Sequence, residues 1–200
     1  MMDIALIKEC ADPSLRPAIV EKFVEAAGSP DPLTITVNSG GRLILVPKAT
    51  TADSAMEIIR QNVGRAVVRV GLTQFPAGVV LKEAYELKSD LVEPCANLRM
   101  GTLMFAKILR IVAKWYGNPR SDDVFPQIFE DAVYAWKTGE FEGVSVFEAE
   151  DPGGSIEMPK QSKVHSIDDE EAAMTIPANG TNEDLGRAGI RIDLSRIGGN

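Results

Sequence analysis

The chain has 200 residues, of which 44% are hydrophobic and 25% are charged, a composition typical of one globular domain with a packed core. Its formal net charge of -8 argues against binding of nucleic acid, which needs basic surface to neutralise phosphates. Residues 1–139 hold 16 basic and 16 acidic side chains, whereas residues 140–200 hold 5 basic and 13 acidic ones. The whole acidic excess therefore belongs to the last third of the chain.

No segment approaches the roughly 20 apolar residues that a membrane-spanning helix needs, so we expect no membrane span. The first ten residues, MMDIALIKEC, lack the basic start and long apolar run of a secretory signal. These features predict a cytoplasmic protein, or a periplasmic one if the true start lies upstream. In the cytoplasm, the two cysteines, Cys10 and Cys95, would be buried thiols.

Apolar periodicity predicts five helices. They cover approximately residues 4–10, 15–27, 51–62, 95–116 and 122–137. The fourth keeps a 3.6-residue apolar period over about six turns, and a helix of this kind is usually central to a bundle.

Two short β-rich runs, LTITV and RLILV, are separated by Asn38-Ser39-Gly40-Gly41 and predict a hairpin. The run AVVRVG, residues 66–71, predicts a further extended piece. The expected fold class is therefore mainly α, of the α+β type, with a helical domain and a small β-hairpin.

The composition changes after Gly139, where sustained apolar periods end. We expect a domain over residues 1–147 and an acidic, mostly disordered tail over residues 148–200. Near the end, Ile190, Ile192 and Leu194 alternate with polar residues. This pattern predicts either a short strand or docking motif, or a weakly ordered terminus.

Several kinds of chemistry are absent from the sequence. There is no P-loop, no G-x-G-x-x-G and no H-E-x-x-H motif, so we expect no cofactor. The single histidine, His165, lies in the acidic tail, and with two cysteines it does not make a metal site. If the chain is an enzyme, carboxylates, amides and hydroxyls must act, as in cleavage of glycosidic bonds.

The ordered part carries five blocks that resemble those of known proteins. In chain order they are CADPSL, AGSPDPLTITVNSGGRL, VRVGLTQF, EPCANLRMGTLMFAKIL and AVYAWKTGEF. They resemble the lysozyme-like lytic transglycosylases of type IV secretion and conjugation systems. More closely, the first 140 residues are similar to the TraH family of rhizobial and agrobacterial plasmid conjugal-transfer proteins.

The resemblance implies a position for the catalytic acid. In the transglycosylases a glutamic acid opens the block E-S-G-x-x-P and protonates the glycosidic oxygen, and the 6-hydroxyl of the sugar then gives a 1,6-anhydro product. Here that block reads AGSPDP, which puts Ala27 at the acid position. Glu25 is a weak substitute, because two residues along a helix correspond to about 200° of rotation.

Three further blocks supply the groove residues that the resemblance implies. The family's G-L-M-Q reads GLTQ here, so Thr73 replaces methionine and Gln74 keeps the sugar-binding amide. The intact P-C-x-N-L-x-x-G block supplies Asn97. The family's Y-N-T-G reads WKTG, so Trp136 lacks the tyrosine hydroxyl and Thr138 is kept. Alternatively, Gln74 satisfies backbone groups in a turn, Asn97 is a local cap or a first-turn residue of a helix, and Trp136 belongs to the core.

The resemblance also implies a pairing of the cysteines. In the secretion-linked transglycosylases, cysteines stand in the early C-A-P block and in the P-C-x-N block and are suited to bridge. Cys10 and Cys95 occupy these two positions, so we expect them to be close in the fold, as a disulfide or as neighbouring thiols.

Three hypotheses for the function follow. The first is a conjugal-transfer accessory protein on a transglycosylase-like domain that has lost its activity. The second is an active peptidoglycan lytic transglycosylase, and the third is a helical interaction module that binds no glycan. The expected partners are peptidoglycan strands or proteins of the conjugation apparatus, the latter recruited through the acidic tail.

Overall fold

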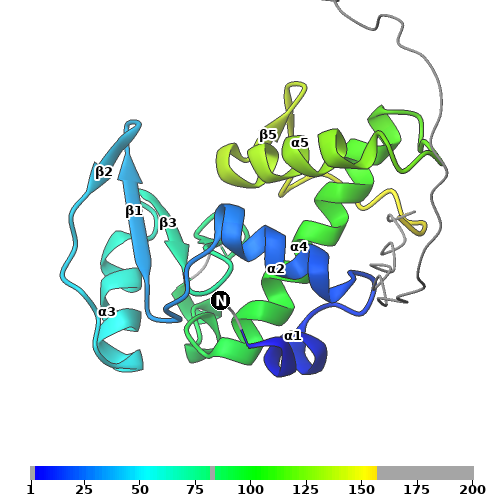
Figure 1. The fold of residues 1–200 in the computed structure, drawn as a ribbon. Coiled ribbons are helices and arrows are strands. Elements are labelled where there is room, and N and C mark those ends of the chain that lie inside the picture. Colours follow the sequence, from blue (N-terminus) through cyan, green and yellow to red (C-terminus); the bar gives the residue numbers. More distant parts are fainter. Residues whose placement is uncertain (1–2, 82–83, 157–200) are drawn as a thin grey trace, which may run out of the picture. The chain divides into compact units, whose positions relative to one another are not determined.

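The computed structural model describes residues 3–81 and 84–156 (Figure 1). Within these ranges the chain is mixed α/β, with five α-helices and a small antiparallel sheet, which confirms the predicted combination of helices with a hairpin. His165 and the alternating segment 190–194 lie outside the described residues. None of the described helices is long and apolar enough to cross a membrane.

The helices of the described ranges follow the predicted apolar periods. They are α1 (Ile4–Cys10), α2 (Pro17–Ala27), α3 (Ala52–Asn62), α4 (Pro94–Trp115) and α5 (Phe125–Thr138). A proline stands in the first turn of α2, α4 and α5, where the missing N–H has no helical partner to lose. Two short 3-10 turns, η1 (Ala84–Glu86) and η2 (Ser89–Leu91), precede α4.

The larger sheet has the strand order β2-β1-β3-β4, with antiparallel neighbours throughout. Its strands are β1 (Ile35–Ser39), β2 (Arg42–Ile44), β3 (Val67–Val70) and β4 (Phe75–Ala77). The sequence predicts the first three but not β4, because Pro76 argues against a strand; the proline is tolerated at the edge of the sheet. A second hairpin, β5 (Glu140–Phe141) and β6 (Val144–Ser145), is too short to show a period in the sequence.

The two faces of the larger sheet differ. Val37 and Val68 are register partners on one face and are fully buried, and α3 contacts both of their strands. Because successive side chains of a strand alternate between faces, Thr36 and its register partner Arg69 lie on the other face. Both of these side chains are polar and only partly buried.

Helix α4 is central to the helical part (Figure 1), as its apolar period indicates, and it contacts α1, α5, η2 and β4. Phe105 of α4 stacks on Phe23 of α2 with 3.9 Å between ring centroids. Trp136 of α5 meets Phe23 edge-on at 5.1 Å. These three buried rings join α2, α4 and α5 and dominate the apolar contact between them.

The described chain remains attached to α4 beyond residue 147, where the sequence predicts the end of the domain. Lys107 Nζ donates hydrogen bonds to the carbonyls of Phe147 and Ala149, both at 2.9 Å. Arg110 binds the Asp151 carboxylate in a two-pronged ion pair, with Nε 2.7 Å from one oxygen. The packed chain therefore extends at least to Asp151, held by polar contacts that an apolar pattern does not show.

The hydrogen bond from Arg110 lowers the pKa of the Asp151 carboxyl below its usual range. A lowered pKa in the folded state means that this contact stabilises the fold above the ordinary carboxyl pKa, and that the stabilisation is lost as the pH falls through the folded value. We expect an NMR titration of the Asp151 carboxyl carbon to show the lowered pKa in the wild type and a return toward the ordinary value in Arg110→Gln. An identical titration in both proteins would contradict this assignment.

Candidate functional site

Four of the five sequence blocks meet at one place in the fold, which we call the junction. It consists of residues 27–29 at the end of α2, the turn 71–74, residues 97–101 of α4 and residue 136 of α5. The fifth block, CADPSL, lies outside the junction and is joined to α4 by a disulfide.

Asn97, in the first turns of α4, is fully buried and uses its whole side-chain amide within the fold. Its Nδ2 donates to the carbonyls of Val70 and Leu91, at 3.0 and 2.8 Å. Its Oδ1 accepts from the backbone N–H and the hydroxyl of Thr73, both at 3.0 Å. The helix cap is Glu93 instead, so Asn97 connects α4 to the end of β3, to η2 and to the turn.

Two glycines allow this close approach. A Cβ on Gly71, whose φ is +74°, would lie 2.5 Å from Nδ2 of Asn97, and a Cβ on Gly101 would lie 2.2 Å from Oγ1 of Thr73. Asn97 and Gly101 are four residues apart and share one face of α4. The spacing of the PCANLRMG block therefore places the hydrogen-bonding side chain of Asn97 and the space left by Gly101 on the face of α4 that packs against the turn.

The end of α2 docks on the same turn through its backbone. A Cβ on Gly28 would lie 2.1 Å from the carbonyl oxygen of Leu72, so only glycine fits there. The N–H of Ser29 donates to that carbonyl at 2.9 Å, and its hydroxyl donates to Oγ1 of Thr34 at 2.8 Å. The small residues of the AGS sequence thus fix the end of α2 against the turn.

Ala27, at the acid position that the resemblance implies, is the last residue of α2 and is partly buried. Glu25 is exposed on the preceding turn. A pocket of about 420 Å³ opens beside this end of α2. It is lined by residues 29–31, 33–35 and 46–49.

Gln74 closes the turn in the left-handed region, with a φ of 51°, which is uncommon for a residue other than glycine. Its Oε1 accepts a hydrogen bond of 2.7 Å from the hydroxyl of Thr36. Its Nε2 donates to the carbonyls of Gly71 and Thr34, at 3.1 and 3.4 Å. The amide of Gln74 therefore satisfies neighbouring groups of the turn and of the strand region.

The end of α5 contributes one buried and one exposed side chain. Trp136 is fully buried, and its Nε1 donates to the carbonyl of Thr73 at 3.1 Å. Thr138 is exposed, and its hydroxyl donates to the carbonyls of Tyr134 and Glu140, at 3.0 and 3.1 Å. The WKTG block thus anchors the end of α5 to the turn and starts β5.

Arg69 of β3 is a residue of this region that the sequence analysis missed. Its Nη2 donates to the carbonyls of Trp136 and Lys137, at 2.6 and 2.8 Å, and its Nη1 donates to the carbonyl of Gln74 at 3.3 Å. Burial lowers its pKa to about 10. A cation at the carbonyl end of a helix is favourable, so Arg69 joins the sheet to α5. The sequence indicates this role only through a single arginine, Arg69, inside the apolar run AVVRVG.

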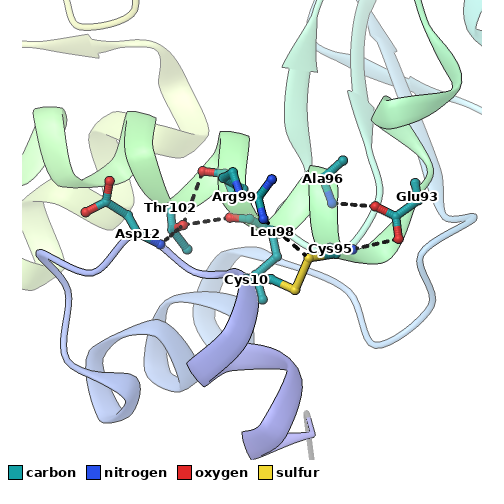
Figure 2. Close-up of a disulfide and its surroundings, with 8 residues drawn as sticks. All are labelled: Cys10, Asp12, Glu93, Cys95, Ala96, Leu98, Arg99 and Thr102. Atoms are coloured by element: carbon teal, nitrogen blue, oxygen red, sulfur yellow. Dashed lines mark hydrogen bonds between the residues drawn. A yellow bond between two sulfur atoms is a disulfide. The ribbon is translucent and has the colours of Figure 1, made fainter.

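Figure 2 shows the disulfide that the structure forms between Cys10 at the end of α1 and Cys95 at the start of α4. Their Cα atoms are 5.1 Å apart. Beside it, the N–H of Asp12 donates to Oγ1 of Thr102 at 2.8 Å, and the carboxylate of Glu93 accepts from two N–H groups of the first turn of α4. The N-terminal block is thereby fixed to the helix that carries the junction.

Most residues expected to line a sugar groove lie behind the surface. Thr73, Asn97 and Trp136 have no exposed surface, and Gln74 is 7% exposed. In this conformation their polar atoms position the backbone of the junction, and only Thr138 is open to solvent.

Chemically, the junction offers amides, hydroxyls and backbone groups, and its described hydrogen bonds involve no carboxylate. Among residues 3–81 and 84–156, no group of three or more His, Cys, Asp or Glu side chains is placed to hold a metal ion.

The fold is mixed α/β, and the described hydrogen bonds of the junction join its helices to its sheet. The chain matches the TraH_2 family over residues 1–199 and belongs to that family. It is 67% identical, over 201 aligned residues and the whole length of both chains, to "Uncharacterized protein y4dP" of Sinorhizobium fredii (strain NBRC 101917 / NGR234). No solved structure matches the chain.

Removal of the Asn97 side chain should strongly destabilise the fold. Asn97→Ala leaves three buried backbone groups without their partner and removes the nearer acceptor of the Thr73 hydroxyl, and we expect the free energy of unfolding to fall by about 2–4 kcal/mol. Chemical denaturation measures this loss. The control is Asn62→Ala, which removes one hydrogen bond at the half-buried end of α3 and should cost less than about 1 kcal/mol. Equal losses in the two variants would show that the junction does not depend on Asn97.

Reduction of the disulfide should also destabilise the protein. Cys10 and Cys95 are 85 residues apart in sequence, and closing a loop of that length contributes about 4 kcal/mol in the chain-entropy description. We expect dithiothreitol to lower the denaturation midpoint of the wild type and to leave that of the double variant Cys10→Ser, Cys95→Ser unchanged. A wild-type midpoint insensitive to reductant would refute the bond as a stabilising element.

Proposed function

We propose that this chain is a conjugal-transfer protein built on a lysozyme-like, transglycosylase-like domain that no longer cleaves glycan. Membership of the TraH_2 family supports the link to conjugal transfer. The five blocks that resemble those of transglycosylases lie around one helix and one turn, which supports the relation to that scaffold.

The observation that carries the proposal is Ala27 at the end of α2. Its immediate neighbours, Gly28 and Ser29, keep their docking on the turn, so the local backbone that would present an acid is retained while the acid itself is missing. Glu25 does not replace it, because its side chain is exposed one half-turn earlier on the helix. A methyl group cannot protonate a glycosidic oxygen, and general acid catalysis needs a positioned proton donor.

The retained scaffold acts by binding, and its partners are glycan strands of peptidoglycan or proteins of the transfer apparatus. The Cys10–Cys95 disulfide supports a site of action in the oxidising periplasm, where such a bond persists and where peptidoglycan lies. In a reducing cytoplasm the two cysteines would remain thiols.

Digestion of purified sacculi tests the loss of activity. We expect the wild type to release no 1,6-anhydro muropeptides, and Ala27→Glu, alone or with Trp136→Tyr, to release them, because a carboxylic acid then stands at the end of α2. The matched control is Ala26→Glu, which places the same group on the exposed neighbouring position of the same helix and should remain inactive.

Two other outcomes would replace the proposal. Release of 1,6-anhydro products by the wild type, abolished by Glu25→Ala, would establish an active transglycosylase. Absence of amide shift changes at Ser29, Thr36 and Thr138 on titration with chitohexaose, together with an inactive Ala27→Glu, would establish an interaction module without glycan binding.

A further inference from the structure

The larger sheet has one open edge. Strand β4, at one end of the order β2-β1-β3-β4, is buried along its whole length, whereas every residue of β2, at the other end, is exposed. Helix α4 contacts β4 and contributes to the cover of that edge. Among residues 3–81 and 84–156, backbone pairing of this sheet with another strand is therefore available at β2 alone.

The open edge is unusually apolar. Leu43, Ile44 and the following Leu45 are 62%, 42% and 90% exposed. Exposed edge strands are normally protected by lysine, proline or a bulge, and none of these interrupts the three residues. Arg42 is the only charged residue between positions 32 and 47, so the edge also carries little charge that would repel a neighbour.

The hairpin geometry fixes which backbone groups point outward. The turn residues Gly40 and Gly41 have φ values of 56° and 76°, as in a two-residue turn whose flanking pair, Ser39 and Arg42, exchanges hydrogen bonds. Pairing alternates along an antiparallel ladder, so Ile44 directs its backbone groups toward β1. The N–H and C=O of Leu43 point away from β1, toward the open edge.

We propose that β2 binds β2 of a second copy of this chain, antiparallel and centred on Ile44. In that register Leu43 lies opposite the partner's Leu45 and the two exchange backbone hydrogen bonds, while the two copies of Ile44 face each other. Arg42 then lies opposite the partner's Val46, so no like charges meet.

The single open edge determines the form of this assembly. Because β4 is covered, the pairing uses the same strand in both copies and closes as a two-fold dimer rather than extending into a fibre. The contact involves few side chains per copy, so the area that each copy buries is well below the roughly 800 Å² per partner of a standard interface. The dimer therefore forms at micromolar or higher concentration.

Sedimentation equilibrium of the full chain, from about 10 to 500 µM, tests the proposal. The apparent mass of the wild type should rise from 21.6 kDa toward twice that value. Leu45→Lys and Leu45→Pro should both remain monomeric, the first through charge and the second through loss of the N–H. Leu103→Lys, which changes an equally apolar side chain 57% exposed on α4, should dimerise like the wild type. A wild type that stays monomeric, or a dimer that Leu45→Lys does not weaken, overturns the proposal.

A cross-link tests the register. Ile44→Cys should give a disulfide-linked dimer under mild oxidation, because the two copies of residue 44 are opposite each other, and Leu103→Cys should not. A dimer that survives in Ile44→Cys without cross-linking would mean that another surface, or another segment of the chain, occupies β2, and would reject the proposed pairing.

Discussion

The fully satisfied amide of Asn97 is the interaction on which the rest of the structure depends. An isolated polar group in a protein interior is costly, but this one has a partner for every donor and acceptor it carries, so burial strengthens its directional contacts. It fixes the turn 71–74, and the backbone of that turn then receives Ser29 from α2 and Trp136 from α5. Three helices and a strand are thereby positioned through one side chain and the turn it holds.

The side chains that hold the junction together are buried and are not available to contact a substrate. The asparagine, the glycines and the tryptophan of the junction serve packing and hydrogen bonding inside the protein, where substitutions destabilise the whole fold. Position 27 lies at the margin of the same region and is partly buried, so alanine is accommodated without loss of a junction contact. The hydrogen bonds that hold the junction together therefore do not depend on the side chain at position 27.

The sequence predicts well those elements that rely on apolar periodicity, namely the five helices, the hairpin β1–β2 and strand β3. It does not reveal the roles of Asn97 and Arg69, because each acts on backbone groups more than 20 residues away that leave no pattern in the sequence. It also misses β4, since Pro76 contradicts local strand propensity and only the edge position makes it acceptable. The sequence does not predict the attachment of residues 147–151 for a similar reason. Lys107 and Arg110 make this attachment through polar contacts, which leave no apolar period in the sequence.

The disulfide imposes an order on the maturation of the chain. Cys10 is synthesised 85 residues before Cys95, so α1 has no covalent partner until the start of α4 has also left the ribosome or the export channel. Throughout that interval the early thiolate is free to attack the disulfide of another molecule, which forms a mixed disulfide and releases the other sulfur as a thiol. Correct pairing therefore cannot precede the arrival of the same helix that brings Asn97 to the turn.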